Sequence, residues 1–574
     1  MNHPSPVKHP KGLFVLFFTE MWERFSYYGM RAILVLYVTN GLLMDDTYAQ
    51  DGVYGSYTGL IWLTPIFGGY VADRFWGNRR SIITGGFLMA AGQFVMFISA
   101  SFYENIMLAH TIMWVGLVLL ILGMGLFKPN ISTMVGQLYP AGDRRLDSAY
   151  TIFYMGINLG AFIGPLICGG LGESYLASGE PARDAFKWGF FAAGIAMLVG
   201  TLTFIWLKNK YVVGPGGKGL GILPNKSNEV EQAATPKEKT ATSLTQIGIW
   251  TLVGIGAVLA FRYLGEMDWI GCFIFGIPIA ISGLIITDNS LTPIERGRVI
   301  VIFISAFFVV FFWAAFEQAG SSLTLFAERN VDRAYKIDTQ LGTAVLVITA
   351  LAALLYYFLQ RIMEIPAEMK RIFAALAIGA VLFAIYHYIQ GTPYFKEEIP
   401  ASWFNSVNSM WLILTAPVLA QIWQWLGTRN MEPSSPKKQA LGLVFLALGY
   451  VIIALVVKDV AGSVSMIWLL ALYLMHTIGE LCLSPIGLSL VNKLAPARFA
   501  SILMGVWFLS NAVANKFGGK LAALLPSKGA TNFAGYQINN LYDFFMLFVV
   551  LSGIAAVLLF ILSYWMEKRM GTVK

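Results

Sequence analysis

Charged residues are scarce in this sequence. Asp, Glu, Lys and Arg make up 13% of the 574 residues, whereas hydrophobic residues make up 57%. Soluble domains carry about 25% charged residues, so this composition excludes an ordinary soluble protein and indicates a polytopic membrane protein. The net charge of +8 is small for this length, and it indicates basic loops on one side of a membrane rather than nucleic-acid binding.

Cysteines and catalytic motifs are scarce as well. Cys168, Cys272 and Cys482 lie in apolar segments without ligand-like spacing, so we expect no disulfide, no metal site and no cofactor. The sequence has no histidine pair, no Gly-x-Ser-x-Gly and no His-Glu-x-x-His, which argues against an enzyme embedded in the membrane. The first residues, MNHPSPVKHPKG, are polar and basic and lead directly into a long apolar segment, so we expect no cleavable signal peptide.

Sixteen apolar segments are long enough to span a bilayer as helices. A polar linker follows the first six, and it has too little apolar surface to fold alone. Two pairs, at 246–287 and 341–390, fit lateral hairpins, because a pair leaves the orientation of every later span unchanged; we expect their role to be structural. The predicted spans are 13–40, 52–73, 81–101, 106–136, 148–171, 186–207, 246–263, 269–287, 297–327, 341–360, 370–390, 402–427, 438–458, 464–491, 498–524 and 541–567.

Basic residues in the loops predict the orientation of the chain. Lys and Arg gather in alternate loops, whereas LLMDDTYAQD after the first span is acidic and has neither. This positive-inside pattern places both termini in the cytoplasm. One loop violates the pattern, because it holds Arg329, Arg333 and Lys336, mixed with acidic residues, on the side predicted to be outside.

The first span concentrates charge inside an apolar helix. A charged side chain at the centre of a bilayer costs roughly 2.5–3.5 kcal/mol, so these residues must face a protein interior or a water-filled cavity and pair with one another. A salt-bridged structural helix explains Glu20 with Arg24, but it gives no reason for Glu23 and Arg31. One helical face collects Glu20, Arg24, Tyr27 and Arg31, with Glu23 and Tyr28 beside it.

Further polar residues lie inside later spans. Lys128 precedes a proline, where a bent helix frees backbone carbonyls, although a lysine that snorkels to the cytoplasmic surface is the simpler alternative. Asn158, among glycines, either packs helices together or donates a hydrogen bond to a substrate. Glu317 and Glu480 each lie in an apolar stretch, and a buried acid is either a structural hydrogen-bonding group or a proton or substrate site.

Three neighbours of these residues bear on their interpretation. Pro485 interrupts the helix near Glu480, which favours a functional acid there. His476, one turn before Glu480, is more often a satisfied core residue. Trp507 is either plain packing or an aromatic lid over a cavity.

The loop between the second and third spans, GGYVADRFWGNRR, fits the major-facilitator pattern Gly-x3-Asp-Arg-x-x-Gly-x-Arg-Arg. We therefore expect an all-α polytopic membrane protein with the major facilitator fold of two six-helix bundles plus extra transmembrane hairpins. The predicted domains are an N-terminal bundle at 1–207, a cytoplasmic linker at 208–245, an inserted hairpin at 246–290, and a C-terminal bundle at 291–574 with a possible second inserted hairpin at 341–390.

Six motifs in order resemble the proton-coupled oligopeptide transporters, also called the POT or PTR family, over nearly the whole core. They are Glu20-x-x-Glu23-Arg24-Phe-x-Tyr27-Tyr28-Gly, GGYVADRFWG, Lys128 in FKPN, FYMGINLG around Asn158, Glu317-Gln318 and Glu480-x3-Ser484-Pro485. The resemblance implies symport of di- and tripeptides with protons into the cell, by alternating access of the two bundles. It implies a carrier rather than an enzyme, active as a monomer in a lipid bilayer, without a nucleic-acid partner.

The resemblance also implies residue roles. Arg31 and Lys128 would hold the peptide carboxylate and Glu480 the amino terminus, a spacing suited to a zwitterion. Glu20, Glu23 and Arg24 would form the proton-coupling cluster, with Glu317 as a gate or proton site. The predicted substrate-binding set is Arg31, Tyr27, Tyr28, Trp62, Lys128, Asn158, Asn408, Glu480 and Trp507.

Three departures from the family pattern qualify this reading. Gly55 stands where animal members have a histidine, so proton coupling must rest on carboxylates. Trp62 stands where the family has a binding-site tyrosine, and Tyr54 and Tyr57 are nearby substitutes for its hydroxyl. The loop near 459–463 is too short for the extracellular domain of animal members, so we expect a bacterial protein of the inner membrane.

Two other functions stay open. A related carrier of nitrate or an amino-acid-like solute would share this fold, although a simple anion has no use for Glu480. A receptor built on a transporter fold would bind its ligand without turnover.

Overall fold

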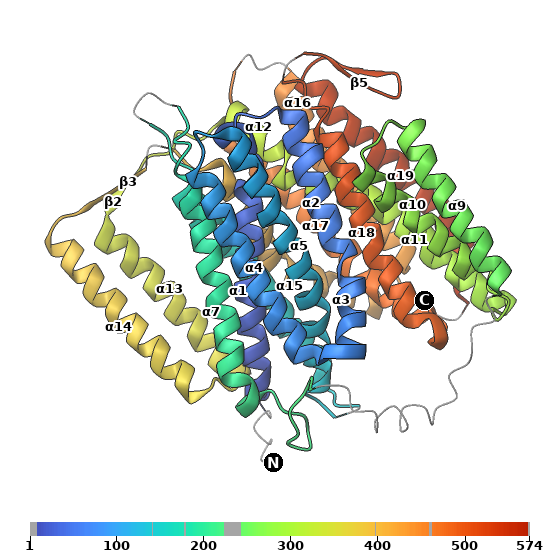
Figure 1. The fold of residues 1–574 in the computed structure, drawn as a ribbon, viewed down its shortest axis with the longest axis horizontal. Helices are drawn as coiled ribbons and strands as arrows, with labels where there is room; N and C mark the ends of the chain where they lie inside the picture. The colour runs from blue at the N-terminus through green and yellow to red at the C-terminus, as the bar shows by residue number, and fades with distance from the viewer. Residues whose placement is uncertain are drawn as a thin grey trace.

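The computed structural model describes residues 8–140, 142–176, 180–222, 243–396, 398–458, 462–527 and 529–571. Its secondary structure is almost entirely helical, and each of the sixteen predicted apolar segments coincides with a helix. Figure 1 shows the helices running roughly side by side, with the N-terminus at the lower end. We call this lower side the terminus face and the upper side the opposite face. Most of the predicted linker, residues 223–242, lies outside the described residues, as do residues 1–7.

The N-terminal half, residues 8–222, is a bundle in which α4 packs on α5, and α1 packs on α6 and α7. Small residues allow this close packing, since a Cβ atom at Gly68 would lie 1.9 Å from the carbonyl oxygen of Gly125. Its helices are α1 (Lys11–Leu36), η1 (Tyr37–Gly41), η2 (Tyr48–Gly55), α2 (Ser56–Leu63), α3 (Pro65–Val71), η3 (Ala72–Trp76), α4 (Gly77–Ser101), α5 (Ile106–Gln137), α6 (Leu146–Gly172) and α7 (Phe186–Tyr211).

The glycine of the major-facilitator loop turns the chain between η3 and α4. Gly77 has a φ of 71°, a conformation that residues with a side chain rarely adopt. A Cβ atom there would also lie 2.6 Å from the backbone oxygen of Ile222. The predicted tight turn is therefore present at the terminus face.

The C-terminal half, residues 291–571, is a second bundle in which α16 packs on α17 and α19, and α11 packs on α18. The helix α17 continues through Pro485, so the expected interruption near Glu480 is absent. Its helices are α11 (Pro293–Phe316), η4 (Glu317–Gly320), α12 (Ser322–Asn330), η5 (Ala401–Ser406), α15 (Val407–Thr428), α16 (Ser435–Lys458), α17 (Met466–Leu494), η6 (Ala497–Phe499), α18 (Ala500–Ala522) and α19 (Leu541–Met570).

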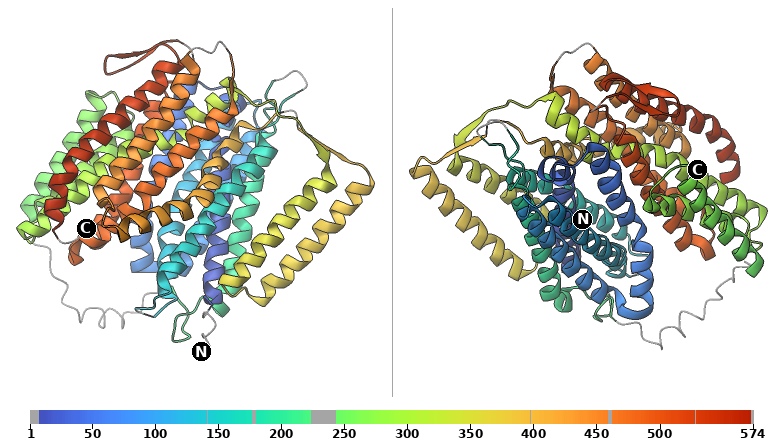
Figure 2. Two further views of the ribbon diagram at one scale, coloured as in Figure 1. Left: turned by 180° about the vertical axis from the view of Figure 1, so that it is seen from behind. Right: turned by 45° about the horizontal axis from the view of Figure 1, so that its top comes forward.

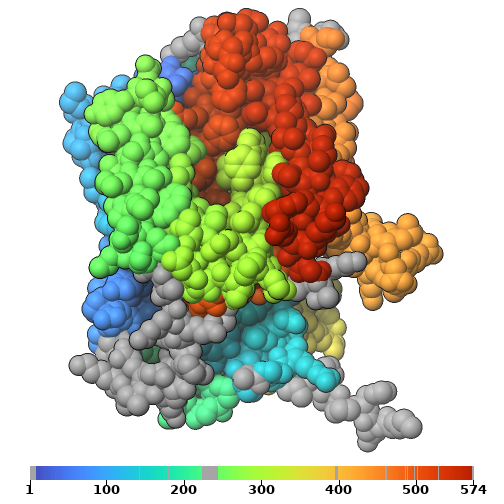
Figure 3. Space-filling view, turned by 90° about the vertical axis from the view of Figure 1, so that its right-hand side faces the viewer, coloured from blue at the N-terminus to red at the C-terminus, as the bar shows by residue number. Residues whose placement is uncertain are grey.

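Two helix pairs lie outside these bundles. The pair α9 (Leu244–Tyr263) and α10 (Trp269–Ile286) packs on α18 and α2, and Figure 3 shows it in green beside the red C-terminal helices. The pair α13 (Leu341–Ile362) and α14 (Ala367–Ile389) stands to one side of the body in both views of Figure 2. The start of α14 contacts the N-terminal half, where Glu368 pairs with Lys210 at 2.6 Å and Phe373 packs against Phe14.

Three two-stranded sheets lie in the loops. The strands β1 (Val331–Asp332) and β4 (Val464–Ser465) pair in parallel. The other two pairs are antiparallel, namely β2 (Ile337–Gln340) with β3 (Pro393–Lys396), and β5 (Thr531–Phe533) with β6 (Tyr536–Ile538). Because β2 and β3 join α12 to α13 and α14 to η5, they attach the second hairpin to the C-terminal half.

Thirteen helices among the described residues are long and apolar enough to cross a membrane, and the 54-residue helical stretch Tyr48–Ser101, with the turn at Gly77, is one of them. The charged helix α1 and the helix α18 are not among the thirteen, but at 26 and 23 residues they are long enough to cross as well. These lengths and this composition are those of an integral membrane protein.

Candidate functional site

The charged face of α1 is buried in the N-terminal half. Arg24 Nε lies 2.5 Å from Oε2 of Glu23 and 3.4 Å from Oε1 of Glu20. The ammonium group of Lys128, from α5, pairs with the same Glu20 oxygen. The side chains of Glu20, Glu23 and Arg24 are no more than 2% exposed, and that of Lys128 is 19% exposed. Two carboxylates and two cations thus form one compact, nearly dry cluster, and Lys128 joins it instead of extending to the surface.

A small cavity of about 10 Å³ borders this cluster. Glu23, Ser26, Tyr57 and Gln93 are among its lining residues. Within the described part of the chain, neither Oε1 of Glu23 nor Oε1 of Gln93 has a hydrogen-bond partner. A space of this size is about the smallest that holds one water molecule, and the two unpartnered oxygens are hydrogen-bond acceptors for it.

Arg31, two turns further along α1, reaches across to the C-terminal half. Its Nη2 atom lies 2.7 Å from Oε2 of Glu317, the first residue of η4, and both side chains are nearly buried. The guanidinium also lies 5.3 Å from the centre of the Tyr28 ring and 5.9 Å from those of Tyr27 and Tyr54. A cation held by a carboxylate and three aromatic faces is well stabilised, and this ion pair connects the two halves.

Glu480 is held within the C-terminal half. Asn408 donates from Nδ2 to Oε2 of Glu480 at 2.9 Å, and also to the hydroxyl of Thr477 at 3.0 Å. Glu480 is 7% exposed. Among the described residues it has no salt bridge, and Asn408 is the side chain that donates a hydrogen bond to it. His476 is buried against Tyr450, as expected of a core residue.

The remaining predicted site residues have plain packing or local contacts. Trp62 stacks on Phe508 across the two halves, with ring planes 13° apart. Trp507 is 4% exposed and lies against Gly487 of α17. Asn158 is nearly buried and donates to the backbone oxygen of Tyr154 in its own helix.

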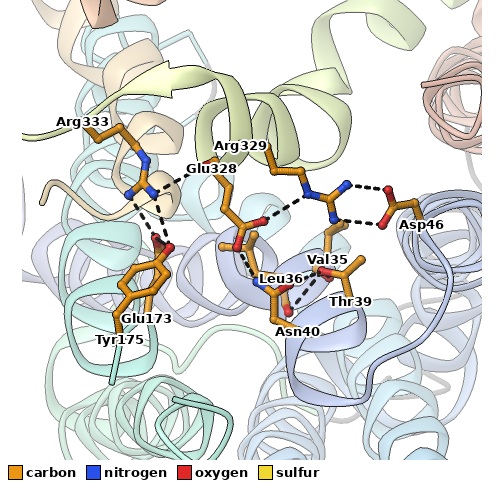
Figure 4. Close-up of polar contacts among 10 residues, drawn as sticks. All are labelled: Val35, Leu36, Thr39, Asn40, Asp46, Glu173, Tyr175, Glu328, Arg329 and Arg333. Atoms are coloured by element: carbon orange, nitrogen blue, oxygen red, sulfur yellow. Dashed lines mark hydrogen bonds and ion pairs between the residues drawn. The ribbon is translucent and has the colours of Figure 1, made fainter. Parts of the chain in front are cut away.

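A second set of charges, not predicted from the sequence, joins the halves at the opposite face (Figure 4). Arg329 makes a bidentate contact with Asp46, with distances of 2.6 and 3.0 Å. Asn40 donates to the carboxylate of Glu328, the residue before Arg329. Arg329 is one of the basic residues that depart from the predicted positive-inside pattern, and in the structure it lies near the end of α12 and is paired with an acid.

Arg333 and Glu173 form the other part of this set. Arg333 Nη1 lies 3.6 Å from Oε1 of Glu173, and its Nη2 donates to the hydroxyl of Tyr175 at 3.3 Å. Glu173 also accepts from the backbone N–H of Ala401 at 2.6 Å, and from the backbone N–H and hydroxyl of Ser402 at 3.0 and 2.7 Å. The carboxylate of one half therefore caps the start of η5 in the other, so the opposite face is closed.

Comparisons with known proteins agree with this architecture. The model of the POT family matches residues 79–223 and 389–538. An uncharacterized transporter of Bacillus subtilis is 31% identical over 536 residues, which cover 92% of this chain and 90% of that protein. A peptide transporter of Yersinia enterocolitica is 30% identical over 535 residues, which cover 89% of this chain and 87% of that protein.

Solved structures give the same result. A mutant of a peptide transporter POT in complex with alafosfalin superposes with a TM-score of 0.70 at 30% identity, covering 98% of this chain and 96% of the other. A POT family transporter in complex with 5-aminolevulinic acid superposes with a TM-score of 0.69 at 27% identity, covering 98% and 97%. The predicted fold class and the predicted family are thus confirmed, and the chain belongs to the POT family of membrane transporters.

Proposed function

We propose that this protein carries di- and tripeptides into the cell together with protons, by alternating access of its two halves. The names of its relatives support the substrate class, since one is a peptide transporter and another, from Lactococcus lactis, is a di-/tripeptide transporter that is 28% identical over 586 residues. The observation that carries the proposal is the Arg31–Glu317 pair, because it places a carboxylate on the predicted peptide-binding cation and joins both halves.

A peptide carboxylate would compete with two internal carboxylates. Arg31 is paired with Glu317, and Lys128 with Glu20. When a peptide takes these cations, Glu317 loses its partner and Glu20 is left with Arg24 at 3.4 Å. In a site of low dielectric constant a carboxylate that loses a cation is unfavourable, which favours uptake of a proton there. Peptide binding and proton binding thereby become favourable together, which is the thermodynamic requirement of symport.

The amino terminus of the peptide would bind in the C-terminal half. Glu480 is a buried acid there, with Asn408 fixing the orientation of its carboxylate. Asn158, on the other half, would add a hydrogen bond after rotating away from its own helix. A ligand held by cations of one half and an acid of the other brings the halves together, and its side chains are left to the aromatic surroundings of Tyr27, Tyr28 and Trp62.

The cluster around Arg24 would handle the transported proton. Glu23 and Glu20 compete for one guanidinium, so protonation of either carboxylate lets Arg24 pair fully with the other. The small cavity beside Glu23 offers a place for the water that delivers the proton.

The charge pattern of the loops supports a terminus face in the cytoplasm, and the bacterial relatives support a bacterial inner membrane. The opposite face, where the halves are ion-paired, would then face the outside. The conformation described here would be the one that is closed to the outside.

An amino-acid-like solute is the second candidate. A POT family transporter at 27% identity was solved with 5-aminolevulinic acid, which has an ammonium and a carboxylate like a peptide. The same cations and the same acid would hold both ends of such a molecule.

Uptake of labelled dialanine into liposomes that contain the pure protein tests the proposal. Accumulation should require an inward proton gradient and should be blocked by a tripeptide, but not by nitrate. Arg31→Ala and Glu480→Gln should abolish it, whereas Asp184→Asn, which removes a half-exposed carboxylate from a surface pair, should not. Competition by 5-aminolevulinate alone would select the second candidate, and competition by nitrate would reject both.

A further inference from the structure

A buried lysine lies between two aspartates where α18 meets the N-terminal half. The side chain of Lys516 is 0% exposed, and its Nζ atom lies 2.7 Å from the carboxylate of Asp51 and 2.6 Å from that of Asp268. It also donates to the backbone oxygen of Asp51 and to the hydroxyl of Ser56, each at 3.0 Å. The lysine thus belongs to one half, Asp51 and Ser56 belong to the other, and Asp268 belongs to the α9–α10 hairpin.

The backbones of the two halves come close together beside this lysine. Three residues further along α18, a Cβ atom at Gly519 would lie 2.7 Å from the Cα of Gly55 and 2.8 Å from the backbone oxygen of Gln50. The backbones of α18 and η2 therefore touch. Any motion that opens the opposite face must separate them and move Asp51 away from Lys516.

The hairpin keeps its aspartate beside α18. Asp268 is the N-cap of α10, and its Oδ1 accepts from the backbone N–H of Gly271 at 2.8 Å, while its Oδ2 contacts Lys516. The helix α10 packs against α18 along its length as well as against α2. Asp268 is therefore placed to stay with Lys516 when Asp51 leaves.

The charges of this group are unbalanced. The carboxylates of Asp51 and Asp268 share the ammonium group of Lys516. Asp268 also faces the positive charge of Lys520, one turn further along α18. Burial alone would raise the pKa of Asp268, but the hydrogen bond and charge of Lys516 outweigh this and hold the pKa below its usual value. Asp268 thus stays ionised, and the further hydrogen bond from Gly271 holds its carboxylate beside Lys516.

We propose that Asp51, Asp268 and Lys516 form a proton-sensitive latch on the opposite face, in which the α9–α10 hairpin supplies the carboxylate that accompanies Lys516 when the halves separate. Protonation of Asp51 breaks the contact across the halves and leaves the Asp268–Lys516 pair intact. The hairpin then has a function beyond structure. The proposal rests on the alternating access of the proposed function.

Distances between spin labels test the latch directly. Labels at Glu104→Cys and Gln537→Cys occupy exposed positions on the opposite face, one in each half, and the parent chain controls for its three buried cysteines. The distance distribution is measured in liposomes at pH 7.5 and pH 5.5. The parent should show a longer distance that becomes more populated at the lower pH.

The variants have opposite expected effects. Asp51→Asn should populate the longer distance at least tenfold more than the parent at pH 7.5 and lose its pH dependence. Asp268→Asn should stay closed at both pH values, because opening would leave Lys516 buried without a partner, and Asp268→Glu should restore the parent behaviour. Asp184→Asn, which carries the same charge change on the same face but affects a pair within one half, is the matched control and should match the parent.

Two results would overturn the latch: an unchanged distance distribution in Asp51→Asn, or opening of Asp268→Asn at pH 5.5 to the same extent as the parent. Size-exclusion profiles and the Asp268→Glu variant separate these outcomes from misfolding. Exchange of labelled dialanine on the same preparations separates them from failure of the proposed function, because the distances report on the halves whether or not a peptide is carried.

Discussion

Replacing Glu173 by alanine should open the opposite face. This carboxylate makes four contacts with the other half: it pairs with Arg333 and accepts from the backbone of Ala401 and from the backbone and hydroxyl of Ser402. All of them join groups on different halves, so they stabilise the closed conformation and contribute nothing to an open one. The substitution therefore acts on the equilibrium between conformations more than on the folding of either half.

The magnitude follows from the burial of the pair. The side chains of Arg333 and Glu173 are 5% and 4% exposed, and removing one partner of a buried ion pair costs about 3–5 kcal/mol. Arg333 keeps Glu398 at 3.3 Å as a half-exposed partner, which favours the lower end of that range. Since every 1.4 kcal/mol is about tenfold in an equilibrium constant, a change of about 3 kcal/mol raises the open population roughly 100-fold.

A cysteine beneath the closed face measures this population. Ser406 is 2% exposed, and its hydroxyl donates to the backbone oxygen of Phe162 across the halves, so a Ser406→Cys thiol is reached from outside only after opening. Its labelling rate with an impermeant maleimide should rise roughly 100-fold with Glu173→Ala. Asp184→Asn, on the same face, should change the rate less than fivefold, because exposed pairs contribute about 0–1 kcal/mol. Labelling of Glu173→Ala at the parent rate would show that this set of contacts does not hold the face closed.

Three further outcomes are expected. Glu23→Gln should retain exchange of labelled peptide but lose proton-driven accumulation, and normal accumulation would exclude Glu23 from proton coupling. Burial alone would raise the pKa of Asp46, but the hydrogen bond from Arg329 outweighs it, so the pKa lies below its usual value. The stability that this pair gives to the closed face is therefore complete above about pH 4 and is lost only below it. Asp46→Asn should accordingly leave the pH dependence of the labelling rate between pH 7 and pH 5 unchanged. Loss of that pH dependence in the Asp46→Asn variant would contradict this. Gly519→Ala would place a methyl group 2.7 Å from the Cα of Gly55 and should destabilise the closed face by about 1–3 kcal/mol, measured by the same labelling rate.

The helices could be predicted from the sequence because each is a local property of composition and length. Apolar runs of about 20 residues predict spans wherever they occur, and the two hairpins were predictable because they come as pairs. Their docking was not predictable. The α13–α14 pair belongs to the C-terminal half by sequence, yet Glu368 contacts Lys210, more than 150 residues away, on the N-terminal half. No local pattern specifies such a long-range contact.

The candidate site shows the same limit. The spacing of Glu20 and Arg24 on one helical face predicted their pairing, which the structure contains. The partners of Lys128 and Arg31 were not predictable, since Glu20 and Glu317 reach them only through the packing of separate helices. Basic residues such as Arg329, on the side predicted to be outside, are the signal in the sequence that an acid elsewhere pairs with them.

The three cations that close the opposite face share one arrangement. Each has a carboxylate from the N-terminal half and another that stays with it: Arg329 has Asp46 and, at 3.7 Å, Glu328; Arg333 has Glu173 and Glu398; Lys516 has Asp51 and Asp268.

A transporter that alternates between conformations needs this second partner. If opening left Arg333 and Lys516, which are 5% and 0% exposed, buried and unpaired, the cost at about 3–5 kcal/mol each would be comparable to the whole stability of a folded domain, about 5–15 kcal/mol, and the open state would hardly be populated. Arg329 is 36% exposed and would add less. When each cation keeps a carboxylate beside it, separation of the halves loses the attraction to the N-terminal carboxylate but leaves no cation unpaired. The difference between the two conformations then becomes small enough for a proton and a peptide to reverse it.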